Sequence, residues 1–133
     1  MSQENVDTLK RAIDAFDRRD IESLALLVTS DFEWFGALLE SVEGGSYSGR
    51  DGMERYFADA ADTWEEFRSV TGEFRDLDDR VLAVGRLEGR GKGSGVLVDV
   101  PYWMLADFRN GEISKCRAYL DRDEALRAAG LAE

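Results

Sequence analysis

The chain has 133 residues, 44% of them hydrophobic and 11% aromatic, which predicts one folded domain spanning residues 1–133. Its 28 acidic residues outnumber its 17 basic ones, and a net charge of -11 disfavours binding to nucleic acid or to an anionic membrane surface. It has no histidine and one cysteine, which excludes Ser-His and Cys-His catalytic pairs, an intrachain disulfide and a cysteine-cluster metal site.

The first third of the chain carries helical signals. Apolar residues recur at helical spacing over 5–20, and Asn5 is a candidate N-cap for that helix. Asp20 would cap a second short helix that runs to residue 28. Residues 29–36 favour a strand or turn. The Gly- and Ser-rich stretch 37–49 is expected to be a loop, which could act as a lid over a pocket.

A long helix is predicted after this loop, over residues 52–70. Its apolar side chains fall on one face at helical spacing and include several aromatic rings. They are Met53, Tyr56, Phe57, Ala60, Trp64 and Phe67.

The second half changes to a strand-like pattern. Four strands are predicted, separated by short turns rich in Gly and Asp, at 72–77, 80–89, 96–108 and 112–120. A last short helix begins near Asp121, which has the capping-box spacing to Glu124. Helices followed by an antiparallel meander indicate an α+β fold. No apolar run is long enough to span a membrane and the first residues are unlike a secretory signal, so we expect a cytoplasmic location.

Four stretches in this order resemble the SnoaL-like branch of the nuclear transport factor 2-like superfamily: "AFDRRDIESLALLVTSDFEW", "YSGRDGMERYF", "GSG" and "FRNGEISKCRAYLDRDEALRAAGL". That superfamily includes ketosteroid isomerase, limonene epoxide hydrolase and polyketide cyclases. The resemblance implies a cystatin-like cone, in which a curved antiparallel sheet and the N-terminal helices enclose a pocket. It also implies a homodimer formed through the outer surface of the sheet.

The resemblance also allows the charged site residues of two relatives to be sought here. The three acid/base positions of an isomerase-type site fall near Ala12, Gly36 and Met104, so those groups are missing. The Arg-x-Asp pair of a hydrolase-type site falls at Arg86 and Glu88, which are therefore the candidate catalytic residues. The alternative for this pair is an exposed Arg–Glu neighbour pair on an edge strand.

The same overlay predicts the lining of the pocket. Alternation along the last two strands turns small and apolar side chains inward. The predicted pocket residues are Trp34, Tyr56, Tyr102, Met104, Cys116, Ala118 and Leu120. We therefore expect a SnoaL-like pocket protein that binds a small, largely apolar molecule without a metal or organic cofactor. Isomerase-, hydrolase- or cyclase-type activity stays open, and the alternative is a non-catalytic dimeric binding or interaction module.

Overall fold

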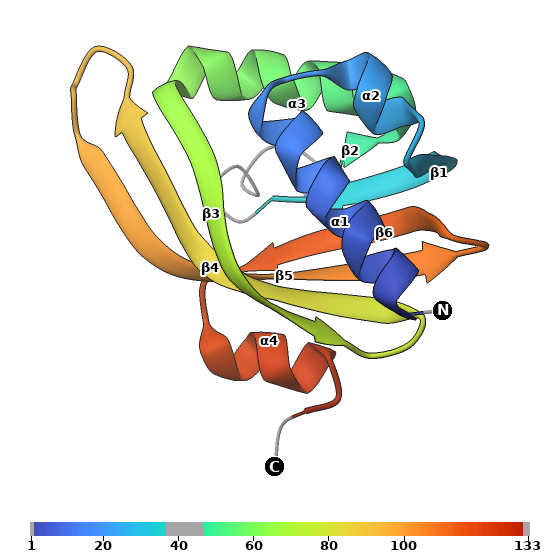
Figure 1. Ribbon diagram of the computed structural model, residues 1–133. Coiled ribbons are helices and arrows are strands. Elements are labelled where there is room, and N and C mark those ends of the chain that lie inside the picture. Colours follow the sequence, from blue (N-terminus) through green and yellow to red (C-terminus); the bar gives the residue numbers. More distant parts are fainter. Residues whose placement is uncertain (1, 37–46, 132–133) are drawn as a thin grey trace.

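The computed structural model describes residues 2–36 and 47–131, and within them helices precede most of the sheet (Figure 1). In chain order the elements are α1 (Ser2–Asp17), α2 (Ile21–Ala25), β1 (Val28–Phe35), β2 (Tyr47–Ser48), α3 (Gly49–Thr63), β3 (Trp64–Asp76), β4 (Arg80–Gly91), β5 (Leu97–Arg109), β6 (Glu112–Tyr119) and α4 (Arg122–Ala128). This confirms the predicted α+β class. Most of the predicted lid, 37–46, lies outside the described residues.

The strands form one curved, unclosed sheet with the order β2-β1-β6-β5-β4-β3. β3 to β6 make the predicted antiparallel meander, whereas β1 joins β6 in parallel. In Figure 1, α1 crosses the hollow side of the sheet and α3 runs along one end of it, while α4 lies on the other side. The hollow side is therefore closed by the N-terminal helices, as the family resemblance implied.

The curvature has a local cause where β3 meets β4. The register of β3 shifts between Thr71 and Glu73, opposite Gly85, and such bulges bend and twist a strand. A Cβ atom on Gly85 would collide with the carbonyl oxygen of Val70 and lie 2.7 Å from the Cα of Thr71. Only glycine allows the two backbones to approach this closely.

The predicted long helix was wrong in its second half. α3 ends at Thr63, and Trp64 to Val70 belong to β3. The error has a physical reason: a register shift between Trp64 and Glu66 places Trp64 and Phe67 against each other, with stacked rings 5.3 Å apart. The bulge therefore brings two apolar residues three positions apart onto the same face of the strand, which is the spacing expected of a helix.

The predicted helix caps were correct at two positions and wrong at one. Asp20 accepts a hydrogen bond from the Ser23 nitrogen, and Asp121 accepts one from the Glu124 nitrogen, as expected of N-caps. The first helix begins at Ser2, so Asn5 is not its cap. Instead, the Asn5 side chain donates to the carbonyl oxygen of Asp78 at 3.0 Å, in the β3–β4 turn.

A second, smaller apolar cluster lies under α4 on the outer side of the sheet. Leu82 of β4 and Leu105 of β5 are buried there against Ala129. Arg80 holds the end of this helix, because its guanidinium donates to the carbonyl oxygens of Ala128 and Ala129. None of the helices in residues 2–36 and 47–131 is long and apolar enough to cross a membrane.

Candidate functional site

Two small cavities adjoin each other between α1 and the inner face of the sheet. Each has a volume of about 20 Å³, enough for about one water molecule. Four side chains wall both cavities: Phe16, Trp34, Ser69 and Met104. The two spaces are therefore separated by side chains, not by backbone.

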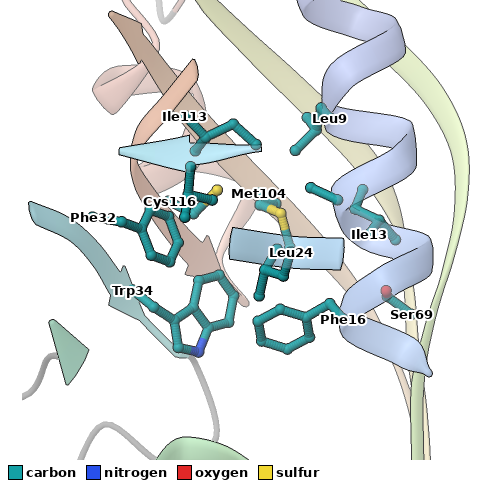
Figure 2. Close-up of a pocket in the computed structure, with 12 residues that line it drawn as sticks. Leu9, Ile13, Phe16, Leu24, Phe32, Trp34, Ser69, Met104, Ile113 and Cys116 are labelled. Carbon is teal, nitrogen blue, oxygen red and sulfur yellow. The ribbon is translucent and has the colours of Figure 1, made fainter. Parts of the chain in front are cut away.

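The first cavity, here called the apolar chamber, is shown in Figure 2. Residues of α1 at helical spacing form one wall, and residues of β1, β5 and β6 form the opposite wall. The lining residues are Leu9, Ala12, Ile13, Phe16, Leu24, Val28, Phe32, Trp34, Ser69, Met104, Ile113 and Cys116. Its surface is almost entirely apolar.

The second cavity, here called the polar chamber, has a different lining. Besides apolar walls it has a carboxyl group, a serine hydroxyl, two tyrosines and the Arg19 guanidinium, whereas the Arg68 side chain pairs with Glu88. The lining residues are Phe16, Asp17, Arg19, Trp34, Tyr56, Phe67, Arg68, Ser69, Leu87, Tyr102, Met104 and Ala118. Ser69 donates to Asp17 Oδ1 from its backbone nitrogen at 3.2 Å and from its hydroxyl at 3.3 Å.

Two polar atoms of this lining are buried without a partner at full hydrogen-bond geometry among the described residues, although Trp34 lies near the Tyr56 hydroxyl and Ser69 lies near the Tyr102 hydroxyl. The two atoms are Nε1 of Trp34 and the hydroxyl of Tyr102. Trp34 is 4% exposed and Tyr102 is 1% exposed. A third such atom, Nε1 of Trp64, belongs to a residue that lines neither chamber. Leaving a buried donor unpaired costs about 1–3 kcal/mol, so such groups in a folded protein call for an explanation.

Burial sets the ionisation of the groups around the chambers. It raises the pKa of Tyr56 to about 12 and the pKa of Tyr102 further still, so both hydroxyls stay protonated and can donate at neutral pH. Burial also raises the pKa of the Cys116 thiol, which keeps it from acting as a nucleophile. The pKa of Asp17 is raised by burial too, although the Ser69 hydrogen bonds and Arg19 oppose that rise.

Comparison with known families identifies the fold that carries this site. The family model described as a SnoaL-like domain matches residues 9–116. The chain belongs to the SnoaL-like family. No curated protein matches its sequence.

Solved structures similar to this SnoaL-like protein share the fold at low sequence identity. An NTF2-like protein of unknown function from Burkholderia pseudomallei has a TM-score of 0.78 and 21% identity, covering 93% of this chain and 95% of that one. TerC, co-crystallised with polyporic acid, has a TM-score of 0.78 and 20% identity, with 96% and 98% covered. A putative SnoaL-like polyketide cyclase from Jannaschia sp. CCS1 has a TM-score of 0.75 and 21% identity, with 99% and 94% covered.

Most of the predicted pocket residues lie around the two chambers. Trp34 and Met104 line both, Cys116 lines the apolar chamber, and Tyr56, Tyr102 and Ala118 line the polar one. Leu120 does not join them. It follows the end of β6, is 42% exposed, and lies with Tyr119 and Asp121 beside α4.

The predicted catalytic pair lies elsewhere. Leu87, between Arg86 and Glu88 on β4, is buried and lines the polar chamber, so its two neighbours point to the opposite face of the strand. There Arg86 pairs with Asp99 at 2.6 Å, and Glu88 pairs with Arg68 at 3.0 Å. A catalytic role for the pair stays a prediction, and it would have to be exercised on the outer face of the sheet.

Three polar residues of the polar chamber were not predicted from the sequence: Asp17, Arg19 and Ser69. Asp17 could have been found, because it stands four residues after Ile13 and thus continues the apolar stripe of the first helix. Ser69 was hidden by the wrong helix prediction for 64–70. Within the described residues, no group of three or more His, Cys, Asp or Glu residues is arranged to hold a metal ion.

Proposed function

We propose that this SnoaL-like protein binds a small, largely apolar molecule in the apolar and polar chambers. The observation that carries the proposal is the pair of buried, unpartnered donors, Trp34 Nε1 and the Tyr102 hydroxyl, in an enclosure with largely apolar walls. Small-molecule sites combine apolar walls with a few convergent polar groups in this way. The structure of TerC with polyporic acid is consistent with a ligand-binding role on this fold.

Binding of anything larger than a water molecule requires the shared wall to move. Phe16 and Met104 separate the two chambers, and the Met104 side chain has three rotatable bonds that let it repack with little strain. Rotation of these side chains would join the chambers into one space. The ligand would then lie between α1 and β5, with its apolar part against Leu9 and Ile13.

Turnover of the bound molecule would have to use the groups that line the chambers. Among the described lining residues Asp17 is the one carboxyl group, and Tyr56 and Tyr102 are protonated donors. This set suits hydrogen bonding and a single proton transfer. The proposal itself is ligand binding, and it does not depend on a reaction.

We also infer that two copies of the chain pair through the outer face of the sheet, as the family resemblance implied. Val70 of β3 is 41% exposed on that side, beside the Arg86–Asp99 ion pair. Light scattering during gel filtration tests this part of the proposal. A mass of twice 14.9 kDa supports it, and a mass of 14.9 kDa at all concentrations contradicts it.

The binding proposal is tested by nuclear magnetic resonance of the tryptophan indole groups. The chain has three tryptophans, and substitution Trp34→Phe assigns the signal of the one that lines both chambers. Titration with toluene is expected to shift the Trp34 indole N–H signal in a saturable way and to leave the Trp103 signal unchanged. Signals that do not move, or that all drift without saturation, would contradict binding in the chambers.

A further inference from the structure

Tyr102 supplies an unused hydrogen-bond donor at the polar chamber. It lies on β5 between Pro101 and Trp103 and is 1% exposed. Burial raises the pKa of Tyr102 and the nearby Ser69 hydroxyl lowers it, but Ser69 donates to Asp17, and the Tyr102 hydroxyl itself has no hydrogen-bond partner among the described residues. Because no protein group among the described residues accepts from it, the Tyr102 hydroxyl can donate to a bound molecule.

Asp17 supplies an acceptor in the same chamber. Both of its hydrogen bonds from Ser69 end on Oδ1, so among the described residues Oδ2 accepts none. Arg19 does not pair with this carboxyl group. Its guanidinium donates to the main-chain carbonyl oxygens of Phe16, Asp17 and Phe67 instead, at 3.3 Å each. Arg19 therefore fixes the end of α1, and Asp17 keeps one oxygen available.

We propose that the polar chamber is a subsite for a hydroxyl group, so that the ligand is an apolar alcohol or phenol. The oxygen of such a hydroxyl accepts a hydrogen bond from Tyr102 while its hydrogen is donated to Asp17 Oδ2. The apolar body of the ligand extends past Phe16 and Met104 into the apolar chamber. This inference rests on the proposed function and adds the chemical class of the ligand to it.

The inference is tested with three probes of nearly equal shape: p-cresol, 4-methylanisole and p-xylene. p-Cresol can accept and donate, 4-methylanisole can only accept, and p-xylene can do neither. Their dissociation constants are measured on the full chain from the Trp34 indole signal. We expect p-cresol to bind about tenfold more tightly than p-xylene, with 4-methylanisole between them.

Two substitutions test the Tyr102 donor and the Asp17 acceptor separately. Tyr102→Phe should weaken both p-cresol and 4-methylanisole by several-fold, whereas Asp17→Ala should weaken p-cresol alone. Neither should change the affinity for p-xylene. Tyr47→Phe is the matched control, because Tyr47 lines neither chamber and its hydroxyl already donates to Asp59 at 2.9 Å.

The outcomes distinguish this inference from the proposed function. Equal affinity of the wild-type protein for p-cresol and p-xylene would overturn the hydroxyl subsite and leave ligand binding in place. No binding of any of the three probes would overturn both. The comparison of probes on the wild-type protein needs no variant, so it decides the matter even if Asp17→Ala does not fold.

Discussion

Ser69 donates two hydrogen bonds to one oxygen of Asp17, from its backbone nitrogen at 3.2 Å and from its hydroxyl at 3.3 Å. Asp17 is the last residue of α1, and Ser69 lies in the middle of β3. The pair therefore fastens the helix that covers the chambers to the strand beside them. It also orients the one carboxyl group among the described lining residues, with its second oxygen unused.

Asp17→Asn should raise the free energy of unfolding relative to wild type, and this gain should be larger at neutral pH than at acid pH. In the folded protein burial raises the pKa of Asp17 above its ordinary 3.8, opposed by Ser69 and Arg19 and assisted by Asp14. Between these two pKa values the folded state holds a proton that the unfolded state has released, so this residue's contribution to wild-type stability falls as pH rises. The asparagine retains an oxygen that can accept from Ser69.

The measurement is urea unfolding of both proteins across a pH series from acid to neutral. The free energy of unfolding of the variant minus that of wild type is expected to rise with pH and then level off. A difference that stays constant or falls with pH would show that the pKa of Asp17 is not raised in the folded protein.

Gly85→Ala should destabilise the protein by about 1–3 kcal/mol, because the new methyl group would meet the backbone of β3 at Val70 and Thr71. Gly72→Ala is the control in the facing strand. No atom would lie within 4 Å of its added Cβ, so it should be neutral or stabilising by about 0.5–1 kcal/mol. Thermal unfolding measures both, and equal effects would contradict the close approach at the bulge.

Met104→Ala should enlarge the chambers at a cost of about 2–5 kcal/mol in the free energy of unfolding. Because Met104 lines both chambers, the variant should also bind p-xylene more tightly than wild type does. Met53→Ala removes the same atoms from an equally buried site in α3 that lines neither chamber. It should cost a comparable free energy without any gain in binding, and a gain in both variants would mean that looser packing alone admits the probe.

Arg80→Met should release α4 from the outer face of the sheet. It removes the donors to the Ala128 and Ala129 carbonyl oxygens but keeps an unbranched apolar stem at this position. Hydrogen exchange of the α4 amides is expected to speed up, while that of α1 stays unchanged. Arg127→Met is the control, because Arg127 is an exposed residue in the last turn of α4. Unaltered exchange in the Arg80 variant would contradict a holding role.

Much of the fold could be predicted because the strands alternate regularly. Buried Tyr102, Met104 and Ala106 follow the two-residue period of β5, so both the strand and its inner face were predicted correctly. The prediction was wrong where the period was interrupted. The bulge between Trp64 and Glu66 places apolar residues three apart on one face, as a helix does. Hydrophobic spacing alone does not distinguish a bulged strand from a helix.

The site could be predicted for its apolar walls and less well for its polar groups. Inward-facing Trp34 and Cys116 follow from alternation, but the pairing of Asp17 with Ser69 joins residues 52 positions apart. Such a contact depends on how α1 packs across β3, which local patterns do not encode. The outward position of Arg86, in contrast, follows from the regular alternation of β4, in which Leu87 belongs to the inner core and Leu82 packs under α4.

Ligand binding in the chambers is tested most directly by a crystal structure of the protein grown with 4-bromophenol, in which anomalous scattering locates the bromine. We expect a bromine peak between α1 and the inner face of the sheet, beside Met104, with the phenol oxygen within hydrogen-bond distance of the Tyr102 hydroxyl. A bromine peak found only on the outer surface, or chambers left unchanged at a saturating concentration of the phenol, would contradict binding in the chambers.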